Sequence, residues 1–120
     1  MTREESLAAV KLIYAALEDK KAQDIKVIAI DEVSSLGDYF VIASGSNENQ
    51  IEAIVDAVEE KMEKAGHRVS HIEGFRRAGW TLMDYKDIVV HIFDTDSREF
   101  YDIERIWKDG HELTEEELRA

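Results

Sequence analysis

The chain has 120 residues, of which 44% are hydrophobic and 35% charged, and its formal net charge at neutral pH is −12. A chain of this length can bury one core, so we expect one domain. It has no cysteine, which excludes disulfides, thiolate catalysis and Cys-ligated metals. No apolar stretch approaches the roughly 20 residues of a membrane span. The acidic, amphipathic N-terminus is unlike a secretory signal or transit peptide, so we expect a cytoplasmic protein that does not contact membranes.

The acidic charge also bears on binding partners. Contact with nucleic acid depends on Lys and Arg side chains that neutralise phosphates, and the basic pairs here are short: Lys20-Lys21 and Arg76-Arg77. We therefore expect little direct contact with RNA or DNA. The charge suits a basic protein partner, because complementary fields speed encounter. Solubility alone is the simpler explanation of the same charge.

The first half of the chain predicts two helices and two strands. Thr2 and Glu5 form a capping-box pattern that opens a helix with an apolar stripe at helical spacing. The β-branched, apolar runs 25–30 and 39–44 are typical of buried strands. A second helix then carries its own apolar stripe, and Gly66 stands where a C-terminal glycine belongs.

The second half predicts strands at 67–73, 80–85 and 87–93 and a helix at 95–107. On that helix Phe100, Ile103 and Trp107 share one face. The acidic tail that follows is predicted to be frayed, with at most one helical turn beginning at Thr114.

The order α-β-β-α-β-β-β-α predicts an α/β fold in which helices pack on a mixed sheet of about five strands. We expect a single compact domain over residues 1–107 and an acidic C-terminal tail over residues 108–120. No repeat or linker divides the chain.

Two fragments raise the question of nucleotide chemistry. Gly45-Ser46 precedes a second capping pattern, Asn47 with Gln50, where backbone N–H groups could bind a phosphate. The glycines are too few for a phosphate-cradling loop, so a tight turn and a helix cap are the favoured interpretation. A nucleotide-transferring enzyme also needs paired carboxylates that hold Mg²⁺ on a neighbouring strand.

The acid pair in the sequence is placed differently. Asp94 and Asp96 follow the last strand, where acids suit a helix N-terminus. We therefore favour capping for both and expect no catalytic residues and no cofactor. His91, within "VVHIF", has no third ligand in sight, so a partly buried, hydrogen-bonded histidine is favoured over a metal ligand. We expect no metal site.

Trp80 is the remaining candidate for function. In the strand "WTLMDY" neither alternate set of side chains is cleanly apolar. A tryptophan beside Asp84 and Tyr85 at a hairpin, after an arginine-bearing loop, resembles a protein-binding hot spot. The alternative is that Trp80 belongs to the core and Asp84 starts the turn. The pattern alone leaves both open.

Several motifs in order resemble one family. They are "DYFVIASG", "EG" at 73–74, "VVHIF" and "REFYDIERIW". Together they are similar to the Iojap family, the ribosomal silencing factors, over nearly the whole chain. The resemblance implies a fold similar to that of nucleotidyltransferases but without their catalytic carboxylates. Gly45-Ser46 would then be the phosphate turn of that fold, kept for architecture.

The resemblance also implies a function. Members of the family bind the large ribosomal subunit through large-subunit ribosomal protein fourteen, block subunit joining and repress translation when nutrients are short. Free members pair as dimers, and organellar relatives are linked to large-subunit biogenesis. The partner surface of the family includes the Trp of a Trp-x-x-x-Asp stretch, which here implies Trp80, Asp84 and Tyr85.

Two positions depart from the family pattern. Lys86 stands where a glycine is usual after the Asp-Tyr pair, and Asn49 stands where arginine is usual. We expect a non-enzymatic silencing factor. The alternatives are a large-subunit biogenesis factor that uses the same surface, and, from another class, a residual nucleotide-handling enzyme.

Overall fold

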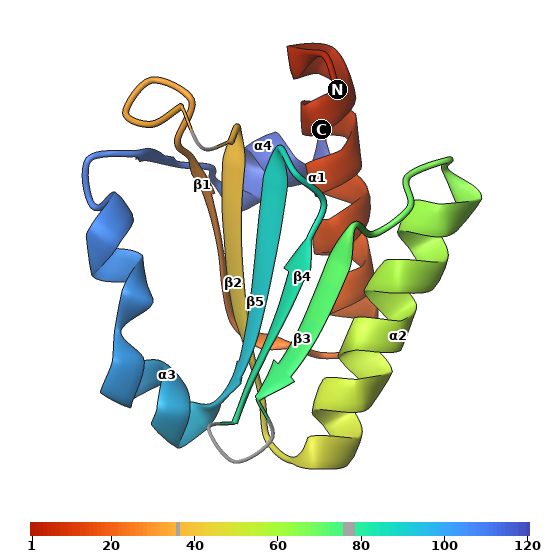
Figure 1. Ribbon diagram of the computed structural model, residues 1–120, viewed down its shortest axis with the longest axis vertical. Coiled ribbons are helices and arrows are strands. Elements are labelled where there is room, and N and C mark those ends of the chain that lie inside the picture. The colour runs from red at the N-terminus through yellow and green to blue at the C-terminus, as the bar shows by residue number, and fades with distance from the viewer. Residues whose placement is uncertain (36, 76–78) are drawn as a thin grey trace.

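The computed structural model describes residues 1–35, 37–75 and 79–120, which form helices packed on one mixed sheet (Figure 1). The elements in chain order are α1 (Arg3–Asp19), β1 (Gln23–Ala29), β2 (Tyr39–Gly45), α2 (Glu48–Lys64), β3 (His71–Phe75), β4 (Trp80–Asp84), β5 (Ile88–Asp94), α3 (Thr95–Tyr101), the 3₁₀ helix η2 (Ile103–Trp107), β6 (His111–Glu112) and α4 (Glu115–Arg119). The predicted α/β class is confirmed. The predicted strand at 67–73 begins later, at His71. Over the described ranges, no helix is long and apolar enough to cross a membrane.

The strands that the structure describes form one six-stranded sheet in the order β3-β4-β5-β2-β1-β6. Its central pair, β2 and β5, is parallel, and the other neighbours are antiparallel. The parallel register sets Gly45 opposite Asp94, so the two central strands end at the same edge of the sheet. That edge is where α2 and α3 begin.

The two faces of the sheet are covered differently. Figure 1 shows α1 and α2 together on one side of the sheet and α3 on the other. Alternate residues of each strand serve the two sides: Val41 packs in the cluster under α1, α2 and α4, while Ile42 packs in a smaller cluster with Phe93 on the other side. We call these the helix-covered face and the open face.

The helix caps follow the sequence closely at the N-terminus of α1. The Thr2 side chain accepts a hydrogen bond from the Glu5 backbone N–H, and the Glu5 side chain accepts one from the Thr2 N–H. This is the predicted capping box. Gly66 follows α2 with φ +89°, as a C-terminal glycine should.

The predicted helix at 95–107 is interrupted. It ends at Asp102, whose backbone takes the left-handed conformation (φ 46°, ψ 44°), and it continues as η2. Asp tolerates this conformation better than most residues do. The break separates the predicted apolar stripe: Ile103 and Trp107 pack on the open face, whereas Phe100 is 78% exposed.

The prediction of a frayed C-terminal tail is wrong. Its β6 pairs with the edge strand β1, and Leu113 and Leu118 are buried on the helix-covered face. The helical turn predicted at Thr114 is present as α4, with a reciprocal capping box to Glu117. Two buried leucines in an otherwise acidic stretch were the signal for this order, because a solvated tail has no need of them.

Candidate partner-binding site

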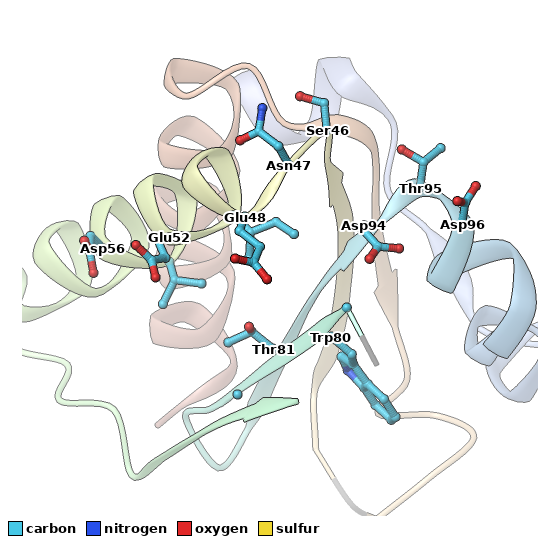
Figure 2. A pocket seen from close by; sticks show the side chains of 14 residues that line it. Ser46, Asn47, Glu48, Glu52, Asp56, Trp80, Thr81, Asp94, Thr95 and Asp96 are labelled. Atoms are coloured by element: carbon cyan, nitrogen blue, oxygen red, sulfur yellow. The ribbon is translucent and has the colours of Figure 1, made fainter. Parts of the chain in front are cut away.

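A cleft of about 520 Å³ opens at the edge of the sheet where β2 and β5 both end (Figure 2). The helices that follow these strands leave to opposite faces, and ligands of α/β proteins commonly bind at such a switch point. The cleft is lined by Ser46, Asn47, Glu48, Ile51, Glu52, Val55, Asp56, Gly74, Gly79, Trp80, Thr81, Asp94, Thr95 and Asp96. Of the four residues of the nucleotide hypothesis, Ser46, Asp94 and Asp96 line this cleft, whereas Gly45, which directly precedes Ser46, does not.

Ser46, which the nucleotide hypothesis places against a phosphate, is already engaged. The backbone N–H of Ser46 donates to the Gln50 Oε1 at 2.6 Å, and the Ser46 hydroxyl donates to the same oxygen at 2.8 Å. Among the described lining residues, the charged side chains are all carboxylates. These would repel a phosphate rather than hold it. Within residues 1–35, 37–75 and 79–120, no group of three or more His, Asp or Glu side chains is placed to hold a metal ion.

Asp94 serves the helix that follows it. Its Oδ1 accepts from the Ser97 backbone N–H at 2.7 Å, as the predicted N-cap of α3. Gly79 packs directly against this cap: a Cβ at Gly79 would lie 1.9 Å from Asp94 Oδ2, and its φ is +62°. The predicted capping role of Asp94 is confirmed, and Asp96 lies exposed in the first turn.

Gly45 and Asn47 shape the start of α2. A Cβ at Gly45 would lie 2.7 Å from the Ile51 Cγ1, so a glycine here lets α2 pack against the end of β2. Asn47 caps α2 by accepting from the Gln50 N–H at 2.8 Å. The reciprocal half of the predicted box differs, because the Gln50 side chain reaches Ser46 instead. Asn49 is exposed in the first turn of α2.

Trp80 lies on the open face, half-buried among other rings. Its indole stacks on Phe93, with ring centroids 5.1 Å apart, and contacts Tyr101 at 5.4 Å and His91 at 5.7 Å. We call Trp80, His91, Phe93 and Tyr101 the aromatic cluster. Figure 2 shows the Trp80 ring pointing away from Thr81, which faces the carboxylates of α2. Trp80 is therefore neither fully core nor a free surface side chain.

His91 is buried beneath this cluster. It is 7% exposed, and its Nδ1 accepts a hydrogen bond from the Trp80 Nε1 at 3.0 Å. Burial lowers the pKa of His91 to about 4, so the ring is neutral at physiological pH. The prediction of a partly buried, hydrogen-bonded histidine is confirmed. The sequence did not indicate its partner, because cross-strand neighbours depend on register.

Asp84 and Tyr85 end on opposite sides of the sheet. Asp84 shares the open face with Trp80, and its Oδ1 accepts from the Lys86 N–H at 2.7 Å. Tyr85 is 3% exposed and belongs to the core of the helix-covered face. The structure thus brings Trp80 and Asp84 to one face and separates Tyr85 from them. The expectation that Tyr85 shares their surface needs this correction, since strand alternation turns it inward.

The turn after Tyr85 uses a strained residue. Lys86 has φ 73°, a left-handed conformation that favours glycine. The chain therefore keeps the turn geometry that a glycine would take, with the Asp84 side chain bonded across it. The departure at Lys86 changes the residue but leaves the hairpin closed.

Negative charge borders the open face. Glu73 lies on the edge strand β3 directly opposite Leu82, and Asp84 lies two residues further along β4. His71 contacts Glu73 from the same strand face. An apolar, aromatic centre with acidic groups at its border is the composition expected of a site for a basic protein.

Comparison with known proteins points to one family. The family model "Ribosomal silencing factor during starvation" matches residues 3–120. The ribosomal silencing factor RsfS of Bacillus subtilis is 37% identical over 101 residues, which cover 84% of this chain and 86% of that protein. A crystal structure of a Chromobacterium violaceum protein superposes with a TM-score of 0.81 at 32% identity, covering 95% of this chain and 92% of the other.

One organellar relative bears a different name. The mouse protein "Mitochondrial assembly of ribosomal large subunit protein 1" is 28% identical over 101 residues, which cover 82% of this chain and 44% of that protein. The family model spans nearly the whole chain, and the bacterial relatives agree with it in sequence and fold. The chain therefore belongs to the Iojap/RsfS family of ribosomal silencing factors.

Proposed function

We propose that this protein is a non-enzymatic silencing factor that binds the large ribosomal subunit through large-subunit ribosomal protein fourteen. Trp80 and Asp84 on the open face would form the centre of the contact. The observation that carries the proposal is the half-buried Trp80, held by the aromatic cluster on a face with acidic borders. Tryptophan is enriched among the residues that dominate binding energy at protein interfaces.

The mechanism would be steric. The molecule has principal extents of 34 × 32 × 27 Å, which is enough to cover a contact of standard size, about 800 Å² on each partner. Bound at a point where the small subunit docks, it would prevent joining without any chemical step. Translation would then be repressed in the cytoplasm while the factor stays bound, and the free protein would pair as a dimer.

The net charge of −12 supports a basic protein as the partner. Ribosomal proteins are mostly basic, and opposite charges speed association and disfavour wrong partners. The same charge opposes direct binding to ribosomal RNA. We therefore expect the protein, rather than the RNA, of the large subunit to provide most of the contact.

A role in large-subunit biogenesis is the second candidate, and the name of the mouse relative favours it. The same face would then act as a placeholder on a maturing subunit. Sedimentation separates the two functions: a silencing factor binds mature, free large subunits and is absent from joined ribosomes, whereas a biogenesis factor is enriched on incomplete precursors.

A residual nucleotide-handling enzyme is the candidate from another class. Titration with nucleoside triphosphates and Mg²⁺ tests it, since only an enzyme of that kind needs to bind them. The hydrogen bonds from Ser46 to Gln50 and from Ser97 to Asp94 argue against it, because they occupy the N–H and hydroxyl of Ser46 and one carboxylate oxygen of Asp94.

The contact is tested by comparing the two tryptophans. Trp80→Ala is expected to weaken binding to purified large subunits by a factor of roughly 30 to 1,000. Trp107→Ala is the matched control, since Trp107 is also half-buried against the smaller cluster on the open face. Both variants lose stability, which thermal unfolding measures. Equal affinities in the two variants would show that Trp80 is not the centre of the contact.

A further inference from the structure

In the hydrogen bond between Trp80 and His91, the chemistry of the two rings determines which one donates and which one accepts. The indole N–H can only donate, so the His91 Nδ1 at 3.0 Å must be the acceptor. The proton of the neutral ring is then on Nε2. Because burial holds the pKa of His91 at about 4, this arrangement persists throughout the physiological pH range.

Ring contacts alone do not define the orientation of the indole. The outer torsion of a tryptophan side chain has broad, roughly two-fold preferences. Stacking on Phe93 at an interplanar angle of 21° is compatible with a ring turned over about this torsion. The hydrogen bond to Nδ1 distinguishes the two orientations, because only one of them directs Nε1 at His91.

His91 is itself held in place. Its ring contacts Phe40 with centroids 4.7 Å apart, and it is 7% exposed. A partner that docks on the open face would therefore meet Trp80, while His91 stays beneath it. His91 would therefore influence partner binding only through the Trp80 indole, without touching the partner itself.

We propose that His91 is a positioning residue for partner binding, whose Nδ1 fixes the Trp80 indole in the orientation that meets the partner. This inference rests on the proposed function, because it assumes that Trp80 is a contact residue. Fixing a side chain before binding improves affinity by removing an ordering cost at the interface. The ordering cost of one side chain corresponds to a loss of affinity of up to about tenfold, so we expect a loss of that order when the acceptor is absent.

Two substitutions separate the acceptor from the packing. His91→Phe keeps an aromatic ring against Phe40 but removes the acceptor. His91→Asn loses the ring but carries an amide oxygen as many bonds from Cα as Nδ1. If His91 positions Trp80, thermal stability ranks Phe above Asn, whereas affinity for purified large subunits ranks Asn above Phe. A merely structural residue would give the same ranking in both measurements.

Two further measurements examine the indole directly. The Trp80 Nε1–H resonance in a ¹H–¹⁵N spectrum of the free protein is expected to shift and to exchange faster with water in His91→Phe, and to stay near its wild-type position in His91→Asn. Trp107→Phe identifies which of the two indole signals belongs to Trp80. In a double-mutant cycle, His91→Phe is expected to have little effect on affinity once Trp80 is already Phe.

The outcomes distinguish this inference from the function on which it rests. If Trp80→Ala loses large-subunit binding while His91→Phe binds as wild type, or if the cycle is additive, His91 is not a positioning residue and the proposed contact stands. If Trp80→Ala binds as wild type, the proposed contact and this inference both fail. The inference is supported if His91→Phe lowers affinity for large subunits about tenfold and His91→Asn binds nearly as wild type. It also requires that His91→Phe has no such effect in a protein without Trp80.

Discussion

Met83 and Leu82 are neighbours in β4 and similar in size, yet they meet very different surroundings. Met83 is fully buried among aliphatic side chains on the helix-covered face. Leu82 points to the open face and is half-buried, between Glu73 of β3 and His91 of β5. One strand thus contributes to a closed core on one side and to a partly exposed surface on the other.

The partial exposure of the open face extends to its aromatic rings. On the open face, Trp80 keeps part of its surface in contact with solvent, although Phe93 and Tyr101 lie against it. A face built only for stability would cover such a ring, because buried apolar area is the main stabilising term. The difference is consistent with a helix-covered face that supplies most of the stability and with the contact proposed for the open face.

Truncation on the two faces is expected to have the largest effect on stability where the core is closed. Met83→Ala leaves a cavity and should lower the free energy of unfolding by about 2–5 kcal/mol. Leu82→Ala should lower it by less, since part of the side chain is already in water. Chemical denaturation of both variants measures the difference. Equal losses would mean that the open face is as tightly packed as the other.

The cap of α3 should contribute less. Asp94→Ala removes the acceptor for the Ser97 N–H and is expected to destabilise the protein by about 1 kcal/mol. Asp96→Ala is the control, because Asp96 is exposed in the same turn. The triple change of Ser46, Asp94 and Asp96 to alanine should leave large-subunit binding nearly intact. A nucleotidyl-transfer activity that disappears in the triple variant would contradict a non-enzymatic factor.

Charge at the border of the open face should act mainly on the rate of association. Asp84→Asn keeps the oxygen that accepts from the Lys86 N–H but removes the negative charge. We expect association with large subunits to slow roughly twofold in this variant, and to slow in the wild type as ionic strength rises. Stopped-flow measurements at several salt concentrations test both. A salt-independent rate would assign the net charge to solubility alone.

The sequence predicted the elements well where local chemistry decides them. Capping residues such as Thr2 and Asn47 act on backbone groups within three positions, so their patterns indicate the helix starts directly. The break at Asp102 was not predicted, because the apolar stripe continues through it. The order of the tail depends on Leu113 and Leu118 meeting a core assembled from distant residues.

The placement of the proposed contact residues in the fold was predictable in part, for the same reason. Strand alternation separates Tyr85 from Asp84 without any knowledge of the tertiary fold, provided that the strand continues regularly into the turn. The contact between Trp80 and His91 depends instead on the register of β4 against β5, in which Leu82 lies opposite His91. Register is set by the whole sheet and by turn geometry, so pairing across strands was not visible in the sequence.

The smallest expected effect concerns Tyr85, whose hydroxyl is the one buried side-chain polar atom without a hydrogen-bond partner among the described residues. An unpaired buried hydroxyl is unfavourable, so Tyr85→Phe should leave stability unchanged or raise it by up to about 1 kcal/mol. Partner binding should not change, because Tyr85 lies on the helix-covered face. A loss of binding in this variant would show that Tyr85 contributes to the contact with the partner.

The same residue makes stability depend on alkaline pH. Burial raises the pKa of Tyr85 to about 12 from its ordinary value near 10. Between these two values the folded protein keeps a proton that the unfolded chain releases. The free energy of unfolding therefore falls as pH rises through this range, and the contribution is fully present below it. In Tyr85→Phe this contribution to the decrease in the free energy of unfolding should disappear, while the other tyrosines still titrate. Denaturation curves at pH 9 and 11 for both proteins measure it, and identical pH slopes would show that Tyr85 does not resist ionisation in the fold.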